Sequence, residues 1–255
     1  KFELIHVQAP PYGPFIEGIK RPFVVTVHSP LSEEMKFRHG WRKLKMRVWR
    51  RMEARTLKHA DAVIAVSDFT RRCLVERSEC DPQKIEVIPN GVDLEAFRPD
   101  KHNHSLPSLM VCSRPDPRKN LALTGEATDY AKGRVRVFSA LGGTPRKAVE
   151  TSFREADIFL TTSFSEGFNL TLLEGMASGC ACLASDIPAH RELIDNGRDG
   201  MLFSDDASMK RLLDMAIADP NLRRMLGDAA RRKAEEYPWS KTAKETLEVY
   251  RKVIS

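Results

Sequence analysis

The sequence predicts an α/β protein with parallel β-sheets, and three observations indicate this class. Short apolar runs rich in β-branched residues alternate with longer segments of helical periodicity, which is the order of strand–helix–strand units. These runs are almost continuously apolar, as in strands that are buried on both faces of a sheet. The length of 255 residues allows a substantial core in one large domain or two small ones.

Two series of predicted strands follow one another along the chain. The first series comprises residues 4–7, 23–27, 62–66 and 85–88. The second comprises residues 109–112, 134–138, 158–160, 181–184 and 201–203. Between the series lies a polar segment with prolines, residues 98–107, which has the composition of a linker. We therefore place a domain boundary in this segment.

The positive charge of the chain is unevenly distributed. The formal net charge is only +6, yet residues 36–58 contain ten Lys or Arg against one acid, Glu53. Such a segment attracts phosphates or anionic lipid head groups. Apolar and aromatic residues are interspersed in it, namely Phe37, Trp41, Met46, Val48, Trp49 and Met52. It is either a peripheral membrane contact or a helix with a solvated basic face and a core-facing apolar one. No recognised nucleic-acid-binding module accompanies the charge, so we expect no nucleic-acid partner.

The cysteines and the hydropathy restrict the expected location. The five cysteines are odd in number and lack metal-ligand spacing, so neither a disulfide framework nor a zinc site is expected. We see no apolar run long enough to cross a bilayer and no signal peptide. The interpretation is a cytoplasmic protein, with peripheral contact at the cytoplasmic face of a membrane as an addition.

The most informative segment is 166–174, which places Glu166 and Glu174 eight positions apart around a predicted helix start. Residues 163–168 are predicted to form a loop, and an apolar helix is predicted from Asn169 onward. Unpaired N–H groups at a helix N-terminus favour phosphate oxygens, and a carboxylate suits paired sugar hydroxyls. One sugar nucleotide could bridge both features. The alternative is an ordinary loop-to-helix transition with one solvated glutamate and one glutamate on the helix surface.

A second candidate feature is the pair of cations Arg114 and Lys119. They follow a predicted strand, five positions apart, with Pro115 and Pro117 between them. Two cations that converge on one point would neutralise a diphosphate; the alternative is a solvated basic turn. Arg114 and Glu166 both come just after predicted strands, where ligands bind in doubly wound sheets.

These motifs together resemble a known family. The segment 166–179 with Cys182-Leu-Ala-Ser-Asp186, Glu192-Leu-Ile, Asn196-Gly and Gly200-Met-Leu-Phe is similar to the donor-binding half of retaining GT-B glycosyltransferases of the GT4 type. The similarity continues through residues 62–67, 84–93, 97–99, 114–120 and 237–240, and is weakest over 121–154, which is short for the family and would lack a strand–helix unit.

The resemblance implies a GT-B fold with two Rossmann-like domains. Residues 1–98 would form an incomplete N-terminal, acceptor-side domain, and 106–235 the C-terminal domain that binds the nucleotide sugar. Residues 236–255 would form a helix that crosses back to the N-terminal domain. Truncation, a separate partner chain, residues missing before Lys1 or a reduced enzyme would each explain the short first domain, whose open sheet edge would be a pairing site.

The resemblance also implies roles for the site residues. Arg114 and Lys119 would hold the donor phosphates and stabilise the leaving nucleoside diphosphate without a metal. Glu166 would contact the transferred sugar and Glu174 the ribose. The backbone amides that line the pocket would come from Gly167, Phe168, Asn169, Leu170 and Thr171. Asn169 stands where the family commonly has glycine, and we expect it to narrow the sugar pocket or change its hydrogen bonding.

The family's N-terminal domain usually carries a histidine in a His-x-His-like context, where this chain has His6-Val7-Gln8. Gln8 would take the place of the histidine, and His6, one strand step away, is expected to point to the opposite face. Glutamine can orient a hydroxyl, but it cannot titrate. His28 ends another predicted strand and is either part of the interdomain cleft or structural.

The expected function is that of a metal-independent retaining glycosyltransferase. It would transfer a hexose from a UDP- or GDP-sugar to a hydroxyl acceptor such as a glycan or a lipid-linked sugar, with no other cofactor. The alternative, favoured by Gln8, is a non-catalytic nucleotide-sugar-binding module or a subunit that needs a partner chain or a second copy. A nucleotide-sugar phosphorylase or synthase acting on glucan is a further option.

Overall fold

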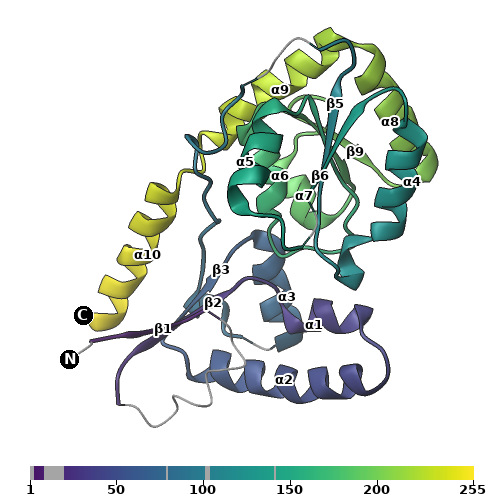
Figure 1. Ribbon diagram of the computed structural model, residues 1–255. Coiled ribbons are helices and arrows are strands. Elements are labelled where there is room, and N and C mark those ends of the chain that lie inside the picture. The colour runs from purple at the N-terminus through teal and green to yellow at the C-terminus, as the bar shows by residue number, and fades with distance from the viewer. Residues whose placement is uncertain (1–2, 9–19, 79, 101–103, 141) are drawn as a thin grey trace. The chain divides into compact units, whose positions relative to one another are not determined.

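The computed structural model describes residues 3–8, 20–78, 80–100, 104–140 and 142–255. The chain forms two compact units, one of Lys1–Asn90 with Ser240–Ser255 and the other of Gly91–Trp239 (Figure 1). We call them the first and the second unit. The predicted linker, 98–107, lies partly outside the described residues.

The first unit contains a four-stranded parallel sheet. Its strand order is β1-β2-β3-β4, with β1 (Ile5–Val7), β2 (Phe23–Val27), β3 (Ala62–Ala65) and β4 (Ile85–Val87). The helices are α1 (Leu31–Glu34), α2 (Gly40–His59), α3 (Asp68–Ser78) and α10 (Trp239–Ile254), and 3-10 turns occur at Met35–Phe37 and Pro82–Lys84. Each strand lies within a run that the sequence predicted.

Both faces of this sheet are buried, which explains why its strands are apolar throughout. On one face, Val25 and Val63 pack in a cluster with Leu57 of α2 and Leu74 of α3. On the other, Val24 and Ile64 pack with Val249, so α10 returns from the end of the chain to cover the first unit's sheet.

The second unit contains a five-stranded parallel sheet in the order β6-β5-β7-β8-β9. Its strands are β5 (Ser108–Cys112), β6 (Arg136–Ala140), β7 (Ile158–Thr161), β8 (Ala181–Ser185) and β9 (Met201–Phe203). Its helices are α4 (Leu121–Ala131), α5 (Arg146–Glu155), α6 (Leu170–Ala177), α7 (Pro188–Leu193), α8 (Asp206–Ala218) and α9 (Pro220–Ala234), with a 3-10 turn at Pro117–Lys119. All strand pairs of both sheets are parallel, which confirms the predicted fold class.

Two glycines allow close packing around this second sheet. A Cβ atom on Gly175 of α6 would lie 2.9 Å from the ring of Phe159, so the helix can approach β7 only without a side chain there. A Cβ atom on Gly227 of α9 would collide with the carbonyl of Gly179, just before β8. These approaches hold α6 close to β7, and α9 close to the segment between α6 and β8.

The segment 121–154, which the resemblance covers least, folds as α4, β6 and α5. Throughout the described part of the chain, no helix is both long and apolar enough to span a membrane.

Candidate functional site

Two loops that follow β5 and β7 are tied together by backbone and hydroxyl hydrogen bonds. The N–H of Phe164 donates to the carbonyl of Arg118 at 2.7 Å. The hydroxyl of Thr162 lies 3.2 Å from the carbonyl of Lys119. Because the carboxyl ends of parallel strands meet at one edge of a sheet, these bonds bring the turn that carries Lys119 against the loop that carries Glu166.

Lys119 and Glu166 form a largely buried ion pair. The distance between Lys119 Nζ and Glu166 Oε1 is 2.5 Å, and only 8% of the Glu166 side chain is exposed. The Ser163 hydroxyl donates to the same carboxylate oxygen at 2.7 Å. Sequence reasoning selected both charged residues, though for contacts with a ligand, and it missed Ser163. The one signal for Ser163 was its position in the same loop.

The second carboxylate, Glu174, is paired on one oxygen only. Arg146 Nη1 lies 2.8 Å from Glu174 Oε1, while Oε2 is buried and has no hydrogen-bond partner among the described residues. Burial raises the pKa of Glu174, and the Arg146 guanidinium opposes that rise. Arg146 also lies over the Phe97 ring, 4.6 Å from its centroid, a cation–π geometry. Nothing in the sequence singled out Arg146, which comes from α5.

Cys112 lies at the end of β5, where charged groups of both ion pairs act on its thiol. Burial raises the pKa of its thiol to about 11, and the charges of Glu174, Lys119 and Arg146 also act on it. The thiol is therefore protonated at neutral pH. The charges that act on this thiol thus include Lys119 of the first ion pair and Glu174 with Arg146 of the second.

The N-terminus of α6 is only partly capped. Asn169 Oδ1 accepts from the N–H of Leu172 at 3.1 Å and from the Thr171 hydroxyl at 2.8 Å. The N–H groups of Leu170 and Thr171 belong to the first turn and have no acceptor within the helix. They carry the partial positive charge of a helix N-terminus, which suits a phosphate. Gly167 is buried and Phe168 is half-buried in the preceding loop.

Asn169 turns its amide into the protein. Its Nδ2 donates to His190 Nε2 at 2.8 Å, and the Nδ1–H of His190 donates to the carbonyl of Ser185 at 2.7 Å. Burial lowers the pKa of His190 to about 4, so the ring is neutral. Asn169 is 2% exposed and makes these hydrogen bonds within the protein; its expected effect on a sugar pocket stays a prediction. His190 was missed because nothing in the sequence connects it to position 169.

Arg114 differs from Lys119 in its exposure and in its partners. Its side chain is exposed, just after β5, and it makes no ion pair in the described part of the molecule. The structure therefore brings Lys119, but not Arg114, into contact with a predicted carboxylate.

The residues predicted in the first unit, Gln8 and His28, are in contact. The Nε2–H of His28 donates to Gln8 Oε1 at 3.0 Å, and Gln8 Nε2 lies 3.2 Å from His6 Nε2. The expectation that His6 points to the opposite face from Gln8 is wrong, because residues two apart on a strand share a face. His6 also contacts Thr26 Oγ1 at 2.8 Å and the Tyr250 hydroxyl at 2.5 Å. Burial lowers the pKa of both histidines.

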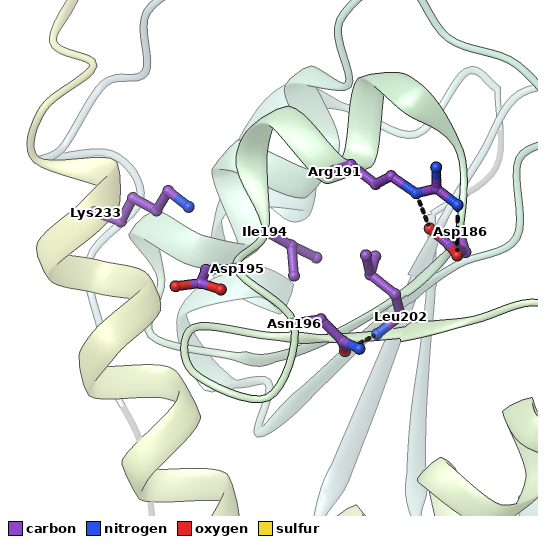
Figure 2. Close-up of a pocket in the computed structure, with 7 residues that line it drawn as sticks. All are labelled: Asp186, Arg191, Ile194, Asp195, Asn196, Leu202 and Lys233. Atoms are coloured by element: carbon purple, nitrogen blue, oxygen red, sulfur yellow. Dashed lines mark hydrogen bonds and ion pairs between the residues drawn. The ribbon is translucent and has the colours of Figure 1, made fainter.

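A separate hollow of about 450 Å³ opens on the second unit (Figure 2). It is lined by Asp186, Arg191, Ile194, Asp195, Asn196, Leu202 and Lys233. Asp186 is held by Arg191 at 2.5 and 2.8 Å, and Asn196 accepts from the Leu202 N–H at 2.8 Å. Lys233 pairs with Asp199 at 3.0 Å, outside the lining. The hollow contains none of the predicted site residues. Across the described residues, no group of three or more His, Cys, Asp or Glu could hold a metal ion.

Comparison with solved structures defines the class of fold. The structure superposes on sucrose-phosphate synthase from Thermosynechococcus elongatus with a TM-score of 0.83, at 19% identity, over 98% of this chain and 73% of the other. It superposes on Anabaena Alr3699/HepE, solved in complex with UDP and glucose, with a TM-score of 0.78 at 18% identity, over 98% and 77% of the two chains. Two parallel α/β units with these neighbours define a GT-B fold.

Family models and curated relatives agree with this fold. Residues 1–96 match Glycosyltransferase Family 4, and residues 131–233 match Glycosyl transferases group 1. The chain belongs to the GT4 family of glycosyltransferases.

Among its relatives are alpha-maltose-1-phosphate synthase of Mycolicibacterium smegmatis, 27% identical over 79% of this chain, and MMP alpha-(1->4)-mannosyltransferase of Mycolicibacterium hassiacum, 26% identical over 92%. D-inositol 3-phosphate glycosyltransferase of Kineococcus radiotolerans is 27% identical over 79% of this chain. The chain spans 66%, 66% and 59% of these three relatives, respectively.

Proposed function

We propose that this chain is a retaining glycosyltransferase that moves a hexose from a nucleoside diphosphate sugar to a hydroxyl acceptor, without a metal. The bond between the anomeric carbon and the phosphate oxygen breaks, and a bond to the acceptor oxygen forms on the same face. The acceptor proton passes to the departing phosphate oxygen. The chain's task is then to position both substrates and to counter the charge of the leaving diphosphate.

The observation that carries this proposal is the half-satisfied carboxylate of Glu174. A buried carboxylate oxygen without a partner is costly, and a ribose hydroxyl would satisfy it. Arg146 holds the other oxygen at 2.8 Å and thereby fixes the orientation of the carboxylate. We assign Glu174 to the ribose of the donor.

The neighbouring groups are suited to the rest of a sugar nucleotide. The first-turn N–H groups of Leu170 and Thr171 would meet the phosphates. Lys119 would exchange part of its contact with Glu166 for a diphosphate oxygen, and the exposed Arg114 would close over the other side. Glu166, oriented by Ser163, would accept hydroxyls of the sugar, beside the amides of the segment 167–169.

Donor binding would then belong to the second unit and the acceptor to the first, in line with the expected domains 1–98, 106–235 and 236–255. The relatives named above include enzymes named for inositol phosphate and for maltose phosphate, and HepE was solved with UDP-glucose. We therefore propose a UDP-sugar as the first donor to test. We place the activity in the reducing cytosol, which is compatible with free thiols at all five cysteines.

The alternative function is a donor-binding module without turnover. Gln8 supports it, because this side chain binds His6 and His28 but cannot exchange a proton. Such a module would need a partner chain or a second copy to supply the acceptor side.

Isothermal titration with UDP, GDP, ADP and their common sugar conjugates, followed by an assay of sugar release to water, separates these functions. Binding with hydrolysis supports the transferase and identifies the donor. Binding without hydrolysis supports the module. The absence of binding for every nucleotide would refute both.

The Glu174→Ala variant tests the site assignment. Hydrogen bonds to a charged group are worth about 1.5–3 kcal/mol, so nucleotide affinity should fall roughly 10- to 100-fold. The matched control is Glu126→Ala, since Glu126 is exposed on α4 of the same unit. Unchanged affinity of the Glu174 variant, with an intact circular dichroism spectrum, would remove the ribose assignment.

A further inference from the structure

Helix α2 (Gly40–His59) of the first unit has two apolar faces rather than one. The inner face is buried and includes Met46 and Leu57, and the helix packs by this side near α1 and α3 (Figure 1). A helix of 20 residues with one buried face normally presents only polar residues on the other.

The outer face instead carries a stripe of large apolar side chains. Trp41 is 71% exposed, Leu44 62% and Val48 51%. Their spacing of three and four residues places them on one side of the helix, and Met46, which is buried, lies away from that side. No described residue covers these three side chains to any large extent. We call Trp41, Leu44 and Val48 the outer stripe.

The outer stripe is surrounded by positive charge alone. Helix α2 carries eight Lys or Arg, and all of them are exposed, namely Arg42, Lys43, Lys45, Arg47, Arg50, Arg51, Arg55 and Lys58. Its single acid, Glu53, is buried. The solvent-facing surface of the helix therefore combines cations with exposed apolar side chains and contains no carboxylate.

We propose that the outer face of α2 docks on the surface of an anionic lipid bilayer, with the helix lying in the interface. Tryptophan and aliphatic side chains at the centre of such a face enter the boundary between head groups and acyl chains, and flanking Lys and Arg bind the lipid phosphates. The two contributions need each other, because either one alone gives weak and reversible binding.

The pattern favours a membrane over other polyanionic or apolar partners. A nucleic acid would use the cations but leave Trp41, Leu44 and Val48 exposed to water. A second copy of this chain docked through the same face would bring two sets of eight cations together, which like-charge repulsion opposes. A lipid surface accommodates both the charge and the apolar stripe.

The structure shows which apolar residues of α2 face the core and which face solvent, a division that the sequence alone did not give. Of the segment's apolar residues, Met46 belongs to the core and Trp49 is half-buried, as a core-facing helix requires. Trp41 and Val48 belong to the outer stripe. Membrane binding is measured without donor or acceptor, and it is therefore independent of the proposed function.

The test is co-sedimentation with phosphatidylcholine vesicles that contain or lack phosphatidylglycerol. The unaltered chain should bind only the anionic vesicles. Trp41→Ser/Leu44→Ser/Val48→Ser should weaken this binding at least about tenfold. The matched control is Met215→Ser/Met225→Ser, which removes exposed apolar side chains of the second unit and should change nothing. Lys45 and Arg51 are exposed and lie beside the outer stripe on the helix; each of Lys45→Gln and Arg51→Gln should weaken binding about fivefold.

Fluorescence distinguishes insertion from electrostatic adsorption. In Trp49→Phe/Trp239→Phe, Trp41 is the only tryptophan, and its emission should shift to the blue on anionic vesicles and be quenched by acyl-chain quenchers. Three results would overturn the proposal: equal binding to neutral vesicles, unchanged binding of the stripe variant, or a dimer in solution that the stripe variant dissolves. The last would show that a second copy covers this face.

Discussion

In both units, an aspartate just before a central strand accepts a backbone N–H group of the neighbouring strand. At the carboxyl ends of the strands, the two units carry different side chains. Asp61, just before β3, accepts the N–H of Phe23 at 2.8 Å, and Asp157, just before β7, accepts the N–H of Ser108 at 2.8 Å. At the carboxyl ends of β5 and β7, however, the second unit has the Lys119–Glu166 ion pair, whereas at the carboxyl ends of β1 and β2 the first has a hydrogen-bonded chain of His6, Gln8 and His28.

In both units the parallel sheet supplies the position, and the loops supply the chemistry. The second unit places charges where a diphosphate sugar would need them. In the first unit, burial lowers the pKa of His6 and of His28, and the Gln8 amide connects the two rings, so this site is suited to orient hydroxyls.

The largest effect is expected for Lys119→Met. The variant leaves Glu166 buried without its cation, and breaking a buried pair in this way costs about 4 kcal/mol of unfolding free energy. Adding Glu166→Gln should restore most of the loss, because the amide oxygen of the new side chain is neutral and still accepts from Ser163. Urea unfolding measures both.

The control for this experiment is Lys210→Met, which removes an exposed ion pair with Asp206 on α8 and should cost about 0.5 kcal/mol. A similar small cost for Lys119→Met would show that the second unit's ion pair is not buried in solution and would weaken the comparison.

The first unit should lose stability as the pH rises. Burial raises the pKa of Glu53 to about 7, against a usual 4.5; Glu34 also raises it, and Arg50 and a hydrogen bond from the Leu31 N–H lower it. Below the unfolded pKa the carboxyl is protonated in both states, so no penalty exists. The penalty grows above pH 4.5 and reaches about 3 kcal/mol at pH 8.

Glu53→Gln removes this titration, so it should be more stable than the parent at pH 8 and equal to it at pH 4. Hydrogen exchange of peptides from β3 reports on the unit that contains the change. A stabilisation that does not vary with pH would mean that Glu53 keeps its ordinary pKa.

The second unit should show the opposite dependence through His190. Its pKa is lowered to about 4 from 6.5, chiefly by burial, so the stability is fully present above pH 6.5 and is lost as the pH falls toward 4. The loss is about 2 kcal/mol at pH 5. His190→Gln should abolish this part of the pH dependence in hydrogen exchange of peptides from β8. If β3 and β8 respond alike, the two units do not differ in the way described.

The strands and the two glutamates were predictable because their signals are local. Most strands are short apolar runs, and buried parallel strands leave that pattern in any sequence. Glu166 and Glu174 stand on either side of a helix start, which periodicity and the N-cap residue Asn169 reveal. Fold class and family followed from these features.

The partners of those residues could not be predicted, because they come from distant positions. Arg146 is 28 residues from Glu174 and His190 is 21 from Asn169, and only the packing of α5 and α7 brings them together. The outer stripe of α2 was equally hidden, since periodicity shows two apolar faces but not which one the core covers. The assigned roles of the site residues and the domain boundaries stay predictions.

The smallest effect concerns Gln8, which joins the neutral site of the first unit. Gln8→Ala removes the acceptor of the His28 Nε2–H and the donor to His6, at exposed or half-buried atoms, so stability should fall by only about 1 kcal/mol. The control, Gln83→Ala, changes an exposed glutamine of the same unit and should have no effect. If the Gln8 amide shields the His28 ring from water, NMR titration should show the pKa of His28 rising toward its ordinary value in Gln8→Ala. An unchanged His28 pKa would mean that strand packing alone desolvates the ring, and that the first unit is neutral because of its sheet and not because of Gln8.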